Sequence, residues 1–205
     1  MTRAWCRRLC FAALLVWPGT VDATPPTSSH RVEALYSAGI YGPYIENDGF
    51  ATPIYSGVTQ GLVLGYGYGF EWLDLGVTLQ LDALLSHPHA LLTTPSLYAR
   101  VHGSDQTGPF AELGLALHRV DNSIKGADPH TGELLTVHYS SHQPAAWLSG
   151  GGTFAVGRAT QLVAKLCLFY AGEGDSDQSR PAVTRRGTPL MTFALFLQVG
   201  LQFEL

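Results

Sequence analysis

The residues from Met191 to Leu205 alternate between apolar and polar side chains with a period of two. Every second residue is apolar, and most residues between them are polar or small. A β-strand places alternate side chains on opposite faces, whereas a helix would spread this pattern around its axis. The segment Leu73 to Leu85 divides in the same way. Both segments are therefore predicted to be strands with one apolar face and one polar face.

Six weaker segments share this period and complete a predicted set of eight strands. They cover Arg31 to Tyr41, Ile54 to Tyr68, Pro95 to His102, Phe110 to His118, Ala145 to Val156 and Gln161 to Ala171. Gln60 interrupts the apolar face of the second strand, and glycines at 150–152 weaken the sixth.

The connections between these strands alternate in length. The long ones are Pro43 to Pro53, Ser86 to Thr94, Asp121 to Gln143 and Glu173 to Pro189, and the short ones are 70–71, 103–108 and 157–160. Outer-membrane barrels have short periplasmic turns and longer outer loops, so this order predicts an up-and-down barrel with both termini in the periplasm. Aromatic residues near the strand ends are expected to lie at the lipid headgroups. They are Tyr66, Tyr68, Trp72, Phe110, Phe154 and Phe203 at the periplasmic ends, and Tyr41, Tyr55 and Tyr170 at the outer ends.

Composition favours a membrane location. The 205 residues are 46% hydrophobic and only 14% charged, which is low in charge for a soluble domain. No stretch beyond the first residues approaches the roughly 18 apolar residues of a transmembrane helix, and a closed barrel is the other structure that satisfies its backbone in lipid. A soluble barrel of the lipocalin type, with its apolar face inward, is the alternative. The near-neutral charge and the lack of a nucleic-acid motif argue against a nucleic-acid partner.

The first residues have the layout of a secretory signal peptide. Arg3, Arg7 and Arg8 precede an apolar run, and Val21 and Ala23 stand at the small-residue positions of a cleavage site. We therefore expect residues 1–23 to be removed and residues 24–205 to form the barrel. Cleavage would leave a single cysteine at position 167, so an internal disulfide is not expected.

The C-terminal residues Gln198 to Leu205 resemble the assembly signal of outer-membrane β-barrel proteins, which the barrel assembly machinery reads. Its residues here would be Val199, Leu201, Phe203 and Leu205. With the signal peptide and the eight-strand pattern, the mature chain resembles the small eight-stranded barrels typified by OmpA, OmpX and OmpW. The resemblance implies an all-β, antiparallel, up-and-down transmembrane barrel in a bacterial outer membrane. The resemblance to OmpW implies an alternative function, namely a narrow channel for small or hydrophobic solutes.

The polar faces of the strands would line the lumen and carry five charges close to the periplasmic ends. These are Asp74, Arg100, Glu112, Lys165 and Glu204. A hairpin register that pairs Gly103 with Pro109 places Arg100 opposite Glu112, where opposite charges attract. Unpaired charges would be costly there, so we predict an ion-pair network. Side chains just fill an eight-stranded interior, so the network would hold the barrel together, with a narrow gate as the alternative.

No metal site or cofactor is expected. The histidines at 87, 89, 130, 138 and 142 could suggest metal binding, but no cysteine or tight carboxylate cluster accompanies them. We interpret them as solvated loop residues.

No catalytic residue is expected either. His138-Tyr139-Ser140 is similar to the His-x-Ser element of outer-membrane lipid A deacylases, in which the histidine would activate the serine, with Glu133 or Glu173 as third member. A hydrolase is therefore the second alternative. The leading hypothesis is a non-enzymatic outer-membrane barrel whose loops 121–143 and 173–189 meet an extracellular ligand or the membrane lipid.

Overall fold

The computed structural model describes residues 29–45, 57–70, 72–85, 87–103, 107–127, 134–172, 174–180, 183–186 and 190–205. In this part of the chain, no helix is long and apolar enough to cross a membrane. The predicted signal peptide, residues 1–23, lies outside the described residues.

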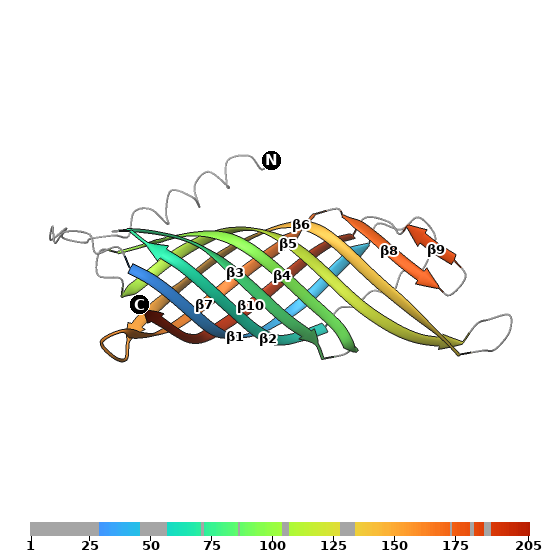
Figure 1. Ribbon diagram of the computed structural model, residues 1–205, viewed down its shortest axis with the longest axis horizontal. Helices are drawn as coiled ribbons and strands as arrows, with labels where there is room; N and C mark the ends of the chain where they lie inside the picture. Colours follow the sequence, from blue (N-terminus) through green and yellow to red (C-terminus); the bar gives the residue numbers. More distant parts are fainter. Residues whose placement is uncertain are drawn as a thin grey trace, which may run out of the picture.

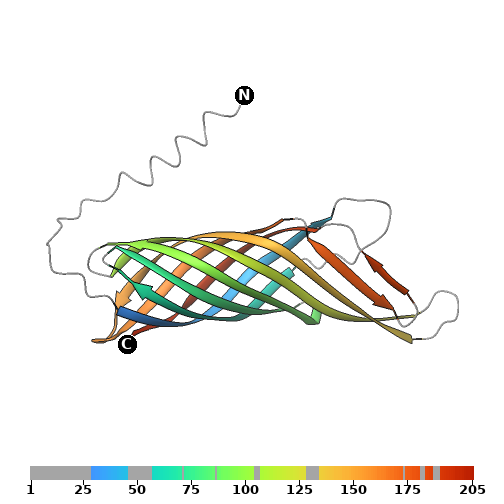
Figure 2. The ribbon, with the colours of Figure 1, turned by 45° about the horizontal axis from the view of Figure 1, so that its top comes forward.

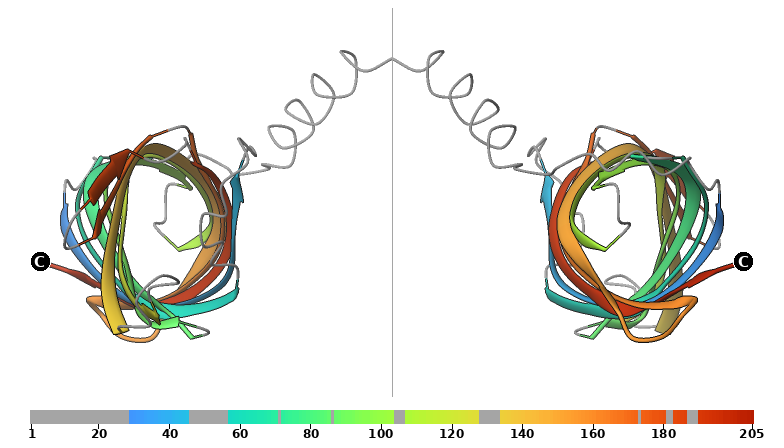
Figure 3. Two further views of the ribbon diagram at one scale, coloured as in Figure 1. Left: turned by 90° about the vertical axis from the view of Figure 1, so that its right-hand side faces the viewer. Right: turned by 90° about the vertical axis from the view of Figure 1, so that its left-hand side faces the viewer.

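Eight long strands form a closed antiparallel barrel (Figures 1 and 3). They are β1 (Ser29–Ile45), β2 (Gly57–Gly69), β3 (Leu73–Leu84), β4 (His87–His102), β5 (Gly108–Ala127), β6 (Leu134–Ala155), β7 (Thr160–Ala171) and β10 (Leu190–Glu204). The neighbours run in the order β5-β4-β3-β2-β1-β10-β7-β6, and β5 pairs with β6 to close the ring. The predicted eight-stranded up-and-down barrel is confirmed. We call the end that holds the start of β1 and the end of β10 the terminus end, and the opposite end the far end.

The apolar faces of the strands point outward. Large apolar side chains are exposed on all eight strands, among them Leu97, Leu115 and Leu197, with exposed fractions of 66%, 67% and 54%. They form a belt far larger than the apolar patches that soluble proteins expose, and it suits hydrocarbon rather than water. The lipocalin-like alternative required the same face to point inward and is therefore wrong.

Two of the predicted headgroup aromatics are wrong. Tyr41 and Phe110 are buried in the lumen, with exposed fractions of 3% and 6%. Tyr41 lies on the same inward face of β1 as Glu33, and Phe110 lies on the same inward face of β5 as Glu112. Proximity to a strand end was therefore the wrong criterion for these two residues, because the side of the sheet is set by alternation along the strand.

Two of the predicted long loops consist largely of strand. β5 and β6 pair without a break from Gly108 with Thr153 to Ala127 with Leu134, so most of the predicted loop 121–143 is a hairpin. β4 begins at His87, so the connection from β3 is two residues long and the predicted loop 86–94 is wrong. The strict alternation of long and short connections is wrong at this hairpin. The three connections at the terminus end are short, as predicted.

The predicted loop 173–189 also contains strands. β8 (Asp175–Arg180) pairs with the outer part of β6, and β9 (Val183–Arg186) pairs with β8. Gly174 lies where a Cβ would be 2.0 Å from the carbonyl oxygen of His142, so only glycine allows β8 to approach β6 so closely. The outer parts of β5 and β6, with β8 and β9, form a sheet that extends beyond the rest of the far end (Figures 1 and 2). We call it the projecting sheet.

Inward glycines make room for the large side chains of the lumen. A Cβ on Gly114 would lie 2.1 Å from the indole of Trp147, and one on Gly67 would lie 2.4 Å from the hydroxyl of Tyr98. A Cβ on Gly151 would lie 2.6 Å from that of Lys165. The lumen is therefore packed by pairing long side chains with positions that have none.

A pair of glycine substitutions tests this packing. Gly114→Ala is expected to lower the free energy of unfolding by about 1–3 kcal/mol, because the indole of Trp147 must shift in a filled interior. Gly150, on the outward face, has nothing within 4 Å of an added Cβ. Gly150→Ala should therefore leave stability unchanged or raise it by about 0.5 kcal/mol. Urea unfolding in lipid vesicles measures both, and equal effects would contradict the packing described.

Candidate functional site in the barrel lumen

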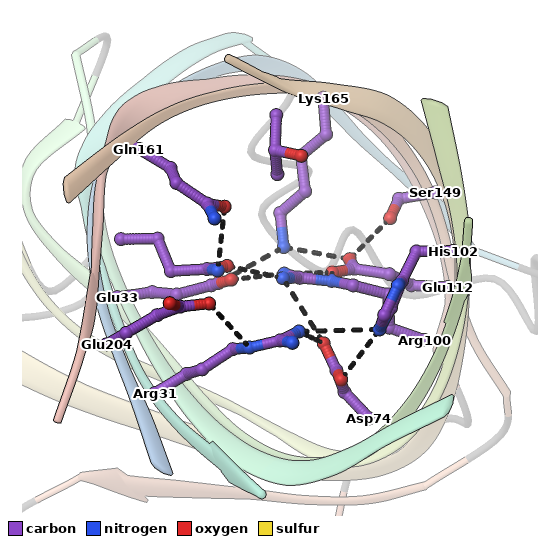
Figure 4. Close-up of polar contacts among 12 residues, drawn as sticks. Arg31, Glu33, Asp74, Arg100, His102, Glu112, Ser149, Gln161, Lys165 and Glu204 are labelled. Carbon is purple, nitrogen blue, oxygen red and sulfur yellow. Dashed lines mark hydrogen bonds and ion pairs between the residues drawn. The ribbon is translucent and has the colours of Figure 1, made fainter. Parts of the chain in front are cut away.

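A cluster of charged side chains fills the lumen near the terminus end (Figure 4). It draws on six strands and comprises Arg31, Glu33, Asp74, Arg100, His102, Glu112, Lys165 and Glu204. We call it the lumen charge cluster. Each member lies on the inward parity of its strand, because the alternation that turns leucines and valines outward turns these residues inward.

Arg100 is the centre of the cluster. Its Nε donates to Glu112 Oε1 at 2.6 Å, its Nη1 donates to Gln202 Oε1 at 2.6 Å, and its Nη2 donates to Glu33. The strand register pairs Arg100 directly with Glu112, and the Phe110 ring lies 4.6 Å from the guanidinium carbon. The guanidinium is planar and forked, which suits two carboxylates that approach from different strands.

Lys165 joins β7 to the same carboxylates. Its Nζ donates to Glu112 Oε2 at 2.8 Å and lies 3.9 Å from Glu33 Oε2. Ser149 on β6 also donates to Glu112 Oε2, at 2.6 Å. Glu112 thus accepts hydrogen bonds from three other strands, which compensates for its removal from water.

The remaining members surround Asp74. Arg31 donates to Asp74, and Glu204 stands 3.8 Å from Arg31 Nε at the margin of the cluster, where its side chain is 27% exposed. His102 Nε2 lies 2.9 Å from Asp74 Oδ1, and its Nδ1 lies 2.7 Å from the carbonyl oxygen of Gly103. The same Nε2 also lies 3.5 Å from Arg31 Nη1, so the ring stands between Arg31 and Asp74.

The cluster pairs cations with carboxylates. Arg31, Arg100 and Lys165 face four carboxylates, namely Glu33, Asp74, Glu112 and Glu204, and His102 lies against Asp74. Pairing of this kind offsets the cost of burying charges in a narrow lumen, and removal of one member leaves another unpaired. The ion pairs and hydrogen bonds of the cluster join side chains from different strands, so the cluster cross-links the barrel.

The structure brings four of the five predicted lumen charges into direct contact and places Glu204 at their edge. Arg31, Glu33 and His102 were not predicted. Arg31 and Glu33 carry a usable signal, since they alternate with apolar residues at the start of the first predicted strand. His102 stands two residues beyond Arg100 and therefore shares its face. Val199, Leu201, Phe203 and Leu205, proposed as an assembly signal, are exposed on the outward side.

The far half of the lumen contains a cluster of buried apolar and aromatic side chains, with buried polar side chains such as Thr94, His118 and Gln143 among them. This cluster includes Tyr41, Leu84, Leu92, Val120, Phe169, Ala171, Ala194 and Phe196. We call it the plug. Between the plug and the lumen charge cluster lies a hollow of about 10 Å³, lined by Gln80, Trp147, Lys165, Cys167, Gln198 and two neighbours. This volume is near the minimum that one water molecule needs.

The predicted His-x-Ser element, His138-Tyr139-Ser140, lies on β6, where Ser140 is partly buried. His142, two residues further along the strand, is exposed. In the strand register, Ser140 stands across from Asp121 and Asp177, and His142 stands across from Arg119 and Asp175. Hydrogen bonds from the exposed Arg119 to Asp121, at 2.6 and 3.0 Å, raise the pKa of Arg119.

The third members suggested from sequence, Glu133 and Glu173, lie outside the described residues. Among the residues that the structure does describe, no group of three or more histidine, cysteine or acidic side chains could hold a metal ion.

Comparisons with known proteins support the fold. No protein-family model and no curated protein matches the sequence. Among solved structures, Neisserial surface protein A is 14% identical, with 85% of this chain and 96% of that chain covered and a TM-score of 0.50. The outer membrane protein OprG from Pseudomonas aeruginosa is 8% identical, with 88% and 97% covered and a TM-score of 0.51. The chain therefore has the fold of small eight-stranded outer-membrane barrels.

Proposed function

We propose that the protein is an integral outer-membrane barrel with a filled lumen, and that its projecting sheet is a surface for contact with an extracellular partner or with lipid headgroups. The terminus end faces the periplasm, because the short turns of such barrels lie on that side. The outward C-terminal residues Val199, Leu201 and Phe203 are then available to the assembly machinery.

The observation that carries this proposal is the occupied cross-section of the lumen. In the described part of the chain, the lumen charge cluster links six strands and the plug lies next to it, with a hollow of about 10 Å³ between them. At the far end, β5, β6, β8 and β9 form the projecting sheet, whereas β3 and β4 end in a two-residue connection. The far end therefore offers surface rather than a passage, and surface segments of this kind commonly carry binding functions.

Conductance across a planar lipid bilayer tests the filled lumen. The purified chain, with all its loops intact, is expected to give no current above the lipid background at neutral pH. Steady single-channel steps under these conditions would overturn the filled lumen and favour the alternative of a narrow channel for small or hydrophobic solutes. A barrel whose mobility on a gel does not change on heating would not have closed and gives no valid measurement.

An epitope inserted between Arg180 and Val183 tests the orientation. The tag should be detected by antibody on intact cells of a Gram-negative host, as should one inserted between Ala127 and Leu134. A tag in the β6–β7 turn at Arg158, which is at the terminus end, should be detected only after the outer membrane is opened. The reverse pattern would overturn the proposed orientation.

A lipid-directed hydrolase is the second candidate. His142 is two residues from Ser140 on the same face of β6, and the strand register pairs it with Asp175 on β8, so the chain holds a candidate nucleophile, base and acid at neighbouring positions. Release of fatty acid from outer-membrane lipid would then be lost in Ser140→Ala. Ser141→Ala is the matched control, because Ser141 is buried on the inward face. No release by the parent protein, or equal release by the parent and Ser140→Ala, would exclude this candidate.

A further inference from the structure

A single histidine stands in the middle of the plug. His118 on β5 is 2% exposed, and its ring contacts that of Phe169 with centroids 5.0 Å apart. Its Nε2 lies 3.1 Å from the hydroxyl of Tyr41, and its Nδ1 lies 2.9 Å from the hydroxyl of Thr94. Both hydroxyls can donate or accept, so a neutral imidazole satisfies both nitrogens without water.

The groups that face His118 carry no charge at neutral pH. They come from Tyr41 on β1, Thr94 on β4, Phe169 on β7 and Gln143, which stands directly across on β6. Tyr41 is the one titratable group among them. Asp82 on β3 has its carboxylate bonded to Gln80, and the lumen charge cluster lies beyond the hollow. Within the described residues, a charged His118 would therefore have no counter-charge in contact.

We propose that His118 is a proton-operated latch of the plug, shut when the imidazole is neutral and open when it is charged. A buried charge that has hydroxyl partners but no counter-charge is unfavourable, and entry of water is the available compensation. Imidazole gains its proton on the acid side of neutrality. Acid would thus hydrate the far half of the lumen and open it to small polar solutes, with the lumen charge cluster remaining as the floor. This control of access goes beyond the proposed contact function of the projecting sheet.

Cys167 is a natural reporter of this opening. It is 4% exposed, lies one inward position below Phe169 on β7, and lines the hollow beside Lys165 and Gln198. A small water-soluble thiol reagent arriving from the far end must pass the plug to reach it. Labelling of Cys167 therefore measures whether the plug is open.

The test compares two substitutions of similar length at neutral pH, in the full chain carrying Cys6→Ser and Cys10→Ser. His118→Arg introduces a charge that cannot be lost by deprotonation, and His118→Met introduces none. In lipid vesicles, a small methanethiosulfonate reagent should label Cys167 at least about tenfold faster in His118→Arg than in the parent, a factor that corresponds to the plug being open roughly ten times more often. His118→Met should match the parent. His142→Arg, on the outward face, is the control for an added charge and should also match it.

An acid arm keeps the proposal testable if His118→Arg fails to form a barrel. The parent is labelled at about pH 4.5 and at about pH 7, and each rate is divided by that of free cysteine under the same conditions, since thiol reactivity itself falls in acid. A raised ratio in acid for the parent, absent in His118→Met, supports the latch. The proposal is overturned if Arg and Met variants label at the same rate, if His142→Arg is accelerated equally, or if the acid effect survives in His118→Met.

Discussion

Replacing Arg100 by methionine is expected to lower the free energy of unfolding by about 3–5 kcal/mol, since removal of one partner from a buried ion pair leaves uncompensated charge. Glu33 and Glu112 would lose their shared guanidinium, and Lys165 alone would remain between them. Urea unfolding in lipid vesicles measures the loss, with the fraction of folded barrel read from its heat-dependent mobility on a gel. The effect should be the largest of any single charge removed from the lumen.

Arg119→Met is the matched control for the Arg100 substitution. Arg119 also pairs with a carboxylate, Asp121, but the two side chains are 50% and 37% exposed. Exposed pairs contribute about 0–1 kcal/mol, so this loss should be small. Equal losses in the two variants would mean that water reaches Arg100 freely, and the filled lumen would then be wrong. Adding Glu112→Gln to Arg100→Met should recover part of the stability, because it removes one unpaired carboxylate.

Leu115→Arg should destabilise the barrel in lipid by about 2–4 kcal/mol, the range for a cation at the bilayer midplane on the outward face of a barrel. Leu115 is among the most exposed of the large apolar residues, and it lies on β5 between Leu113 and Leu117, which are also exposed. In water such a substitution would cost little, because the side chain contacts solvent in either form. The measurement is again urea unfolding in lipid vesicles.

Phe154→Arg is the control for depth in the membrane. Phe154 is outward and exposed near the terminus end of β6, where the cost of a cation should fall to about 0–1 kcal/mol. If Leu115→Arg and Phe154→Arg lowered the free energy of unfolding by the same amount, the orientation of the barrel in the bilayer would be contradicted. If instead the parent chain proved to be a stable monomer in water without detergent, the outward belt could not face lipid at all.

The lumen shows which contacts can be predicted from the alternation of inward and outward residues along a strand. Parity alone was enough to select Asp74, Arg100, Glu112 and Lys165 as inward charges. It did not show that Arg31 and Glu33 lie at the same height, because height depends on the tilt of each strand and on its register with both neighbours. The register of β1 with β10 pairs Arg31 with Glu204, a contact between opposite ends of the chain.

The projecting sheet shows where the alternation of apolar and polar residues stops being informative. Beyond the membrane both faces of a strand meet water, so polar residues on both faces are tolerated and the period of two disappears. The strands β5 and β6 continue there because the backbone hydrogen bonds of their hairpin continue. On the other edge of β6, the pairing with β7 ends at Ala171 and β8 pairs with β6 from Asp175, where Gly174 allows the close approach. Within segments 121–143 and 173–189, the described residues 121–127, 134–143, 175–180 and 183–186 therefore have the sequence of loops and the backbone of strands.

The sequence by itself determined the class of fold, the number of barrel strands and the side of each strand that meets lipid, because alternation is local and is repeated on every strand. Only the tertiary structure decided which inward side chains meet. Arg100 and Glu33, or Tyr41 and His118, lie 67 and 77 residues apart in the chain. Closure of the barrel brings such pairs to one level, and no local pattern records that level, because it is set jointly by the registers of all eight strands.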